Sequence, residues 1–211
     1  MMDVAERAGL RADYYFMAEG SHPLDGTYRL DDPWVIDLMA RIAARGHEVG
    51  FHPSYRTSDE PALLAQELAR LRRACAAAGV EPARWGGRQH FLRWRAPASW
   101  RAWEEAGLDY DSSVGWADAI GFRSGTCREH PVFDLEAGRP LGLRERPLVV
   151  MEGSFFQTGL PAKDIPGRVA ALRRAVERVG GELSLLWHNS RLQERRDVKA
   201  FRASVARAVG A

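Results

Sequence analysis

Several polar side chains stand directly after short apolar runs of the sequence, where they could do chemistry: His52, Arg88, His90, Asp111, Glu152 and His188. A metal hydrolase needs two or three nitrogen or oxygen ligands and an open position for water. His52 and His90 could supply two such nitrogens from neighbouring strands. The alternative is that each imidazole hydrogen-bonds a backbone carbonyl. His47 stands before its apolar run, and we expect it to be structural.

Strands and helices are expected to alternate along the chain and to position these side chains. The expected strands are 12–17, 48–51, 85–88, 109–111, 147–151 and 182–187. The expected helices are 2–8, 33–44, 61–78, 98–106, 165–179 and 198–209, and residues 112–146 are expected to be irregular. We expect Asp31 or Asp32, Asp59 and Asp164 to cap three of these helices.

This alternation is typical of an α/β protein built from parallel βα units. Such units form either an open, doubly wound sheet or a closed barrel. In both forms the carboxyl ends of the strands open on one face, and that face carries the active site. The polar residues that follow the strands are therefore expected to gather there.

The composition excludes several classes of protein. The 211 residues are 45% hydrophobic and 27% charged, with a formal net charge of +2, so the chain is too apolar and too balanced in charge to be disordered. No apolar run reaches the roughly 18 residues that span a bilayer. Two cysteines, Cys75 and Cys127, cannot build a disulfide scaffold, and with no visible signal peptide they favour a cytoplasmic protein. We expect a single domain over residues 1–211.

The basic residues do not indicate a nucleic-acid partner. Of the 30 lysines and arginines, only Lys163 and Lys199 are lysine, and the arginines are interleaved with acidic residues along the chain. Nucleic-acid binding needs basic residues clustered on one face. We therefore expect no nucleic-acid partner and no membrane span, and the sequence gives no indication of the oligomeric state.

Four segments carry a further signal because of their order: GHEVGFHPSY at 46–55, Gly87-Arg88-Gln89-His90, EEAGLDYDSS at 104–113 and LSLLWHNS at 183–190. Together they resemble the motifs of the polysaccharide deacetylase (NodB-homology) family, over nearly the whole chain. The resemblance implies a distorted (β/α) barrel. It also implies a metal-dependent hydrolase that removes N- or O-acetyl groups from a polysaccharide or glycan precursor. A carbohydrate substrate and a divalent metal, with zinc as the first choice, are the expected partners.

The resemblance implies roles for particular residues. His52 corresponds to a metal ligand, Arg88 to the arginine that orients the general base, and His188 to the general acid. The family places a second metal histidine four residues after the first, where this chain has Arg56. Arginine stays protonated and cannot bind a metal. We hypothesise that His90 replaces the missing ligand, since it stands where the family has a proline.

Tyr55, Arg123 and Trp187 are the candidate substrate-binding residues. Tyr55 and Arg123 could line a substrate groove, and for both the alternative is a structural role in a loop. Trp187 is one of seven tryptophans in the chain, several of which could stack on sugar rings.

The family's first motif, an Asp-Asp pair at the end of the first strand, has no counterpart in this chain. The expected helix 2–8 comes first, and Asp31-Asp32 precedes Pro33 and a helix, where capping explains the pair better. The general base, one metal ligand and the first strand are therefore missing, and the missing strand would leave an exposed sheet edge. We expect the 211 residues to be N-terminally truncated. The alternative is a degenerate member of the family.

Two other functions stay open. A catalytically inactive relative that lacks the general base would only bind glycans. An amidohydrolase with the same fold and metal would act on a small amide that is not a sugar, because the loops that select the substrate carry no readable code.

Overall fold

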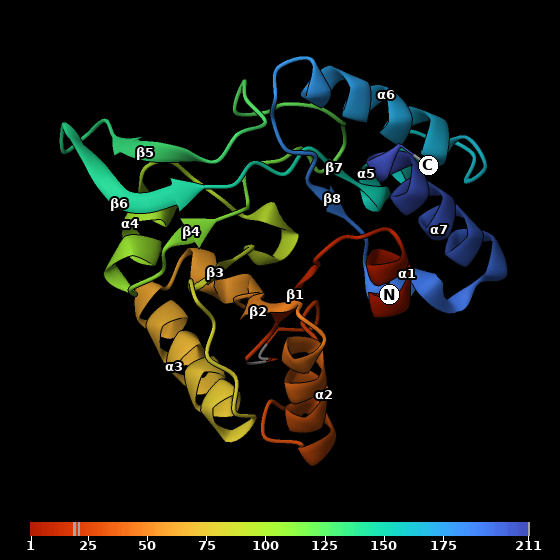
Figure 1. Ribbon diagram of the computed structural model, residues 1–211. Helices are drawn as coiled ribbons and strands as arrows, with labels where there is room; N and C mark the ends of the chain where they lie inside the picture. Colours follow the sequence, from red (N-terminus) through yellow and green to blue (C-terminus); the bar gives the residue numbers. More distant parts are fainter. Residues whose placement is uncertain (19, 21, 211) are drawn as a thin grey trace. The chain divides into compact units, whose positions relative to one another are not determined.

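The computed structural model covers residues 1–211 and describes all of them except 19, 21 and 211. The chain forms two compact units (Figure 1). The first consists of Met1–Leu10, Val114–Arg128 and Pro147–Ala211, and the second of Arg11–Ser113 and Glu129–Arg146. The second unit contains His52, Arg88, His90 and Asp111, whereas the first contains Glu152 and His188.

A six-stranded sheet runs through the second unit (Figure 1). Its strands are β1 (Asp13–Phe16), β2 (Glu48–Phe51), β3 (Gly86–Gly87), β4 (Tyr110–Asp111), β5 (His130–Asp134) and β6 (Arg139–Glu145). They lie in the order β1-β2-β3-β4-β6-β5, and all neighbours are parallel except β5, which runs antiparallel to β6. The carboxyl ends of β2, β3 and β4 are therefore neighbours along one edge of the sheet.

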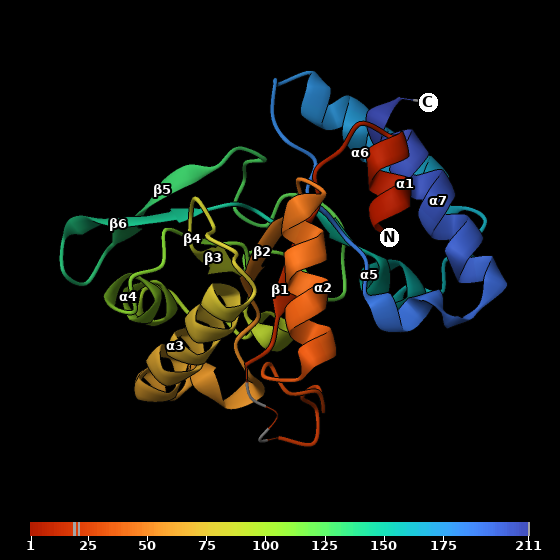
Figure 2. The same cartoon turned by 60° about the horizontal axis from the view of Figure 1, so that its bottom comes forward.

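Three helices complete the second unit: α2 (Pro33–Ala44), α3 (Pro61–Ala77) and α4 (Ala98–Glu105). Both α2 and α3 begin with proline, which suits the first helical position because its missing N–H would have no partner there. They lie side by side (Figure 2). Each buries one apolar face at helical spacing, made of Val35, Met39 and Ile42 in α2 and of Leu64, Leu68 and Leu71 in α3.

The first unit is mainly helical. Its parallel strands are β7 (Val150–Met151) and β8 (Leu185–Leu186), and its helices are α1 (Met2–Arg7), α5 (Glu152–Gln157), α6 (Ile165–Glu177) and α7 (Arg195–Val209). Helices α6 and α7 pack against each other. A buried apolar cluster joins the strands to the helices, with Val150, Phe155, Ile165, Val169, Trp187, Ala200, Phe201 and Val205.

The predicted α/β fold with a mainly parallel sheet is confirmed. Each of the six predicted strands contains an observed strand, and each of the six predicted helices is present. Two strands and one helix were not predicted. The strands β5 and β6 form a hairpin in the stretch 112–146 that was expected to be irregular, and α5 comes directly after β7. Closure into a barrel stays a prediction, because the strands form a six-stranded and a two-stranded sheet.

The predicted helix caps are wrong in their chemistry. Neither Asp32 nor Asp164 makes a side-chain capping hydrogen bond, although each precedes its helix. Asp31 pairs with Arg29 instead, and the carboxylate of Asp59 accepts a hydrogen bond from Arg93 at 2.6 Å. Arginine side chains thus take the carboxylates of Asp31 and Asp59, while Asp32 accepts a hydrogen bond from the backbone N–H of Arg29 at 3.3 Å.

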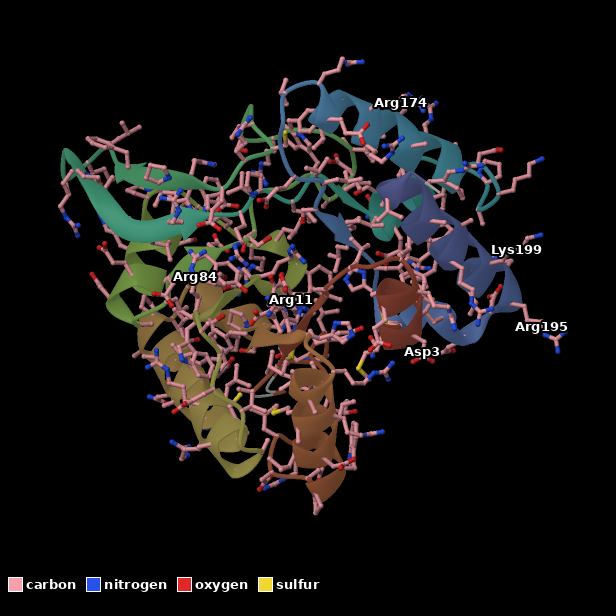
Figure 3. All side chains as sticks on the ribbon, in the orientation of Figure 1. Asp3, Arg11, Arg84, Arg174, Arg195 and Lys199 are labelled. Atoms are coloured by element: carbon pink, nitrogen blue, oxygen red, sulfur yellow. The ribbon has the colours of Figure 1, made fainter. Side chains whose placement is uncertain are left out.

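Charged side chains are distributed over many elements, and several are paired. Figure 3 shows Arg174 on α6 and Lys199 on α7, both pointing outward. In the second unit, burial raises the pKa of Glu129, but hydrogen bonds from Arg84, Arg146 and Arg144 lower it to about 2. Within the described part of the chain, none of the helices has the length and apolarity that a membrane crossing needs.

A close approach of two backbones joins β2 to β3. A Cβ atom on Gly87 would lie 1.7 Å from the carbonyl oxygen of Phe51, which is far inside van der Waals contact. The same carbonyl accepts a hydrogen bond from the Arg88 N–H at 2.9 Å. Only glycine allows the two strands to be this close at this point.

We expect Gly87→Ala to lower the free energy of unfolding by about 3 kcal/mol or more, because the added methyl group meets backbone atoms that cannot rotate away. Urea denaturation followed by circular dichroism measures the change. Gly167→Ala in α6 is the matched control, since nothing lies within 4 Å of its added Cβ, and its effect should stay within about 1 kcal/mol. Equal stability of Gly87→Ala and wild type would contradict the described contact.

Candidate functional site

Three candidate side chains of the second unit lie at the ends of neighbouring strands. His52 follows β2, Arg88 follows β3, and Asp111 ends β4. Backbone hydrogen bonds continue the ladder past the strands, from the His52 N–H to Phe16 and from the Ser112 N–H to Gly87. The sheet therefore fixes the spacing of these three residues, as the parallel pattern predicts.

The structure brings His52 and His90 together. Nε2 of His52 lies 2.9 Å from Nδ1 of His90. The other nitrogen of each ring faces a backbone carbonyl: Nδ1 of His52 lies 2.6 Å from the oxygen of Arg88, and Nε2 of His90 lies 2.8 Å from the oxygen of Leu24. The carbonyl partners expected as an alternative are thus present as well.

The carbonyl contacts determine which nitrogens carry protons. A carbonyl oxygen only accepts hydrogen bonds, so Nδ1 of His52 and Nε2 of His90 must be the protonated nitrogens. In two neutral rings, the nitrogens that face each other at 2.9 Å then both present lone pairs. Such an approach becomes favourable when a cation, either a proton or a metal ion, lies between the lone pairs.

The two histidines fit a metal as a pair of ligands. Metal-bound histidines commonly donate their second N–H to a carbonyl, and both rings have that partner here. A catalytic zinc site needs three protein ligands. Among the described residues no group of three or more histidine, cysteine, aspartate or glutamate side chains is arranged to hold a metal. The pair therefore supplies two donors and not a complete set.

Asp25 is a neighbour of this pair that sequence reasoning missed. Its side chain is fully buried, and Oδ1 lies 3.7 Å from Nε2 of His90. The same carboxylate accepts hydrogen bonds from the N–H groups of His22 and Tyr55 at 2.9 Å. Asp25 lies between the predicted strand 12–17 and the predicted helix 33–44, and only the fold of this connection brings it to His90. Arg56, at the position of the family's second histidine, pairs with Glu60 at 2.6 Å instead.

Arg88 is buried and holds the segment after β4. Its Nε donates to the carbonyl of Ser112 at 2.8 Å and its Nη2 to Ser112 Oγ at 2.7 Å. Asp111 beside it is fully buried, and its Oδ1 accepts hydrogen bonds from the N–H and hydroxyl of Ser113. Oδ2 has no hydrogen-bond partner among the described residues. Burial raises the pKa of Asp111 to about 6, against the opposing effects of Ser113 and Arg88.

In the first unit His188 pairs with Glu152. Each follows a strand, His188 after β8 and Glu152 after β7. Nδ1 of His188 lies 2.5 Å from Oε1 of Glu152. The glutamate is buried, while 47% of the histidine side chain is exposed. An ionised carboxylate only accepts, so Nδ1 carries the proton and Nε2 is the nitrogen available for chemistry. The strand-end pattern marked Glu152 but gave it no role.

The three predicted substrate-binding residues have different surroundings. Trp187 is buried and packs against Phe201 at 5.4 Å between ring centroids, so in this structure it belongs to the core and offers no surface to a sugar ring. Arg123 donates to the carbonyl of Gly115 at 3.0 Å and lies over the ring of Trp116. Tyr55 is half-buried and begins the 3-10 turn η1 (Tyr55–Ser58).

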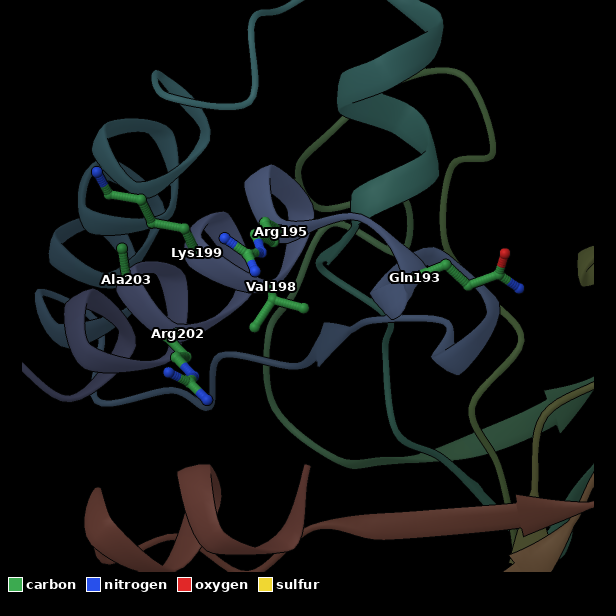
Figure 4. A pocket seen from close by; sticks show the side chains of 6 residues that line it. All are labelled: Gln193, Arg195, Val198, Lys199, Arg202 and Ala203. Carbon is green, nitrogen blue, oxygen red and sulfur yellow. The ribbon is translucent and has the colours of Figure 1, made fainter.

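A separate cavity of about 580 Å³ lies on α7 (Figure 4). It is lined by Gln193, Arg195, Val198, Lys199, Arg202 and Ala203. None of the predicted site residues lines it. The case for chemistry in this protein therefore depends on the paired side chains above and not on this cavity.

Comparisons with protein-family models and with curated proteins give no match. The fold is similar to the crystal structure of a putative polysaccharide deacetylase from Mycobacterium smegmatis, with a TM-score of 0.62 and 17% sequence identity. The similarity covers 99% of this chain and 69% of the other. It shows a shared fold, and closure of that fold into a barrel stays a prediction.

Asp111 should make stability depend on pH. Its pKa is raised from 3.8 to about 6 in the folded protein, so the unfolded chain releases this proton first as the pH rises. The contribution of Asp111 to the free energy of unfolding is fully present below pH 4. It falls by about 3 kcal/mol as the pH rises through about 6. Free energies of unfolding measured between pH 4 and 7 should fall less steeply for Asp111→Asn than for wild type.

Glu129→Gln is the control for this measurement. The pKa of Glu129 is lowered to about 2, so its contribution is present above pH 4.5 and is lost only as the pH falls towards 2. The variant should be less stable than wild type but should keep the wild-type slope between pH 5 and 7. A wild-type slope in Asp111→Asn would show that Asp111 ionises normally.

Proposed function

We propose that this protein is a hydrolase of the deacetylase type that removes N- or O-acetyl groups from a polysaccharide or glycan precursor. The observation that carries the proposal is the pair of facing nitrogens of His52 and His90, 2.9 Å apart. Two lone pairs this close repel each other unless a cation lies between them. The fold similarity to a polysaccharide deacetylase and the four sequence segments support the choice of reaction.

The proposed role of the histidine pair is to hold a divalent metal, for which we expect zinc. When bound, such an ion supplies Lewis-acid activation of water and of the acetyl carbonyl. The carbonyls of Arg88 and Leu24 keep the two rings in the orientation and tautomer that a ligand needs. Arg88 acts indirectly, because its buried guanidinium fixes Ser112 next to Asp111.

The proposed role of His188 is that of general acid. Hydrolysis adds water to the acetyl carbon and breaks the bond to nitrogen or oxygen, and the leaving atom needs a proton. Protonated His188 would donate it from Nε2, since Nδ1 is bonded to Glu152. The hydrogen bond to the buried carboxylate holds the ring in place.

A non-catalytic glycan-binding protein is the second candidate. The observation that favours it is that no group of three metal-binding side chains is found among the described residues. Such a protein would bind oligosaccharides and leave their acetyl groups intact, so a direct assay separates the two candidates.

The function is tested by acetate release from acetylated chitooligosaccharides and acetylated xylan, with and without a chelator. We expect chelator-sensitive release, a 10²- to 10⁴-fold lower kcat for His188→Ala, and a smaller loss for Glu152→Gln, which keeps His188 but weakens the hydrogen bond that orients it. His130→Ala, on β5, is the control and should keep wild-type kcat. Oligosaccharide binding without acetate release would support the second candidate and reject the first.

Zinc binding tests the histidine pair independently of activity. Isothermal titration with zinc at pH 7.5 should give at least a tenfold weaker affinity for His52→Ala and for His90→Ala, because each removes one of two donors. His130→Ala should bind zinc like wild type. An unchanged zinc affinity in His90→Ala would show that His90 is not a zinc ligand. The cation between the two rings would then be a proton.

A further inference from the structure

Phe91 is held in an unusual conformation next to the histidine pair. It lies in the 3-10 turn η2 (His90–Leu92), and both Phe91 and Leu92 have positive φ values, 58° and 51°. A side chain in this left-handed region makes the folded state less favourable by roughly 1 kcal/mol or more per residue. Nevertheless 56% of Phe91 is exposed, so burial of the ring does not offset this strain.

Two neighbouring rings hold Phe91 in place by T-shaped contacts. It meets Tyr55 at 5.6 Å between centroids and His90 at 4.7 Å, both at an interplanar angle of 82°. At this angle the edge of one ring points towards the other ring, so these contacts position Phe91 without a stacked partner. His90 itself is fixed by its hydrogen bonds to His52 and Leu24, so the exposed ring stands on a rigid support.

Tyr55 belongs to that support. His22 stacks on it at 4.4 Å with an interplanar angle of 15°, and the guanidinium of Arg93 lies 4.0 Å from its centroid. Two groups this close to one ring cannot share a face, so both faces of Tyr55 are covered. Arg93 is fixed in turn by the carbonyl of Tyr55 and by Asp59. The exposed aromatic surface of this cluster is therefore that of Phe91.

We propose that Phe91 is a stacking platform for a pyranose ring of the glycan chain. The C–H groups on the flat face of a β-linked, gluco-configured sugar carry partial positive charge and suit the negative face of an aromatic ring, while the hydroxyls stay in water. The exposed ring matches the size of one sugar residue, whereas a protein partner needs several hundred Å² on each side. The inference rests on the proposed function, because it names a binding position for the same class of substrate.

Binding of two tetrasaccharides tests the platform. The probes are tetra-N-acetylchitotetraose, which has acetyl groups, and cellotetraose, which has none and cannot be deacetylated. We expect wild type to bind both, Phe91→Ala to raise the dissociation constant about 3- to 10-fold, and Phe91→Trp to bind at least as tightly as wild type. Phe133→Ala is the matched control, since Phe133 is 47% exposed on β5 of the same unit, and it should keep wild-type affinity.

Melting temperatures of the variants test whether weaker binding comes from misfolding and not from the loss of the ring. Phe91→Gly removes both the ring and the strain, so its melting temperature should be at least that of Phe91→Ala while its affinity is equally weak. Weak binding in a variant of undiminished stability would identify the ring as the cause. The proposal is overturned if wild type binds neither tetrasaccharide, if Phe91→Ala binds like wild type, or if Phe133→Ala weakens binding as much.

The outcomes also separate this inference from the proposed function. In the acetate-release assay, Phe91→Ala should raise KM for the acetylated tetrasaccharide and leave kcat within about twofold, because the stacking contact is made equally in the ground state and the transition state. Acetate release with an unchanged KM would reject the platform and retain the deacetylase. Phe91-dependent binding without any acetate release would reject the deacetylase and retain the platform.

Discussion

The contact between Gly87 and the Phe51 carbonyl sets the arrangement on which the candidate site of the second unit depends. Because a Cβ at position 87 would lie 1.7 Å from that oxygen, the strands can pair here only while position 87 has no side chain. Pairing at this point fixes the next residue of each strand, His52 on β2 and Arg88 on β3. The carbonyl of Arg88 then lies 2.6 Å from the His52 ring. A backbone constraint thus determines a side-chain tautomer.

The tautomer has chemical consequences. Nδ1 of His52 and Nε2 of His90 donate hydrogen bonds to carbonyls. The lone pairs of the other two ring nitrogens therefore point towards each other. The arrangement resembles the outer shell of a metal site, where backbone carbonyls orient the ligand rings. In the first unit a carboxylate does the same work, because buried Glu152 holds the Nδ1 proton of His188 and leaves Nε2 for proton transfer.

Apolar runs predicted the strand positions because buried parallel strands need little besides apolar residues. The hairpin β5–β6 was missed, since Pro131 and Gly142 interrupt its alternation. The pairing of His52 with His90 was also accessible, because both follow strands that became neighbours. Asp25 and Phe91 were not accessible: loop folding brings Asp25 to His90, and no local pattern marks an aromatic residue for a positive φ. Trp187 was predicted to bind substrate, but its ring is buried in the structure. The burial of a tryptophan depends on tertiary packing, which the sequence alone does not show.

Departures from ordinary packing occur where chemistry is proposed and also in the helices, where Arg173 and Ser204 have buried polar atoms without a hydrogen-bond partner among the described residues. The helices bury regular apolar faces, yet Phe91 carries backbone strain, and Asp111 and Glu152 each keep a buried oxygen without a hydrogen-bond partner among the described residues. Each feature disfavours the folded state. Asp111 ends β4, Glu152 directly follows β7, and Phe91 lies in the turn η2 that comes after β3. At a functional site, this cost to stability is offset by a benefit other than stability. Ligand binding and proton transfer are benefits of that kind, because both need groups that folding leaves incompletely satisfied.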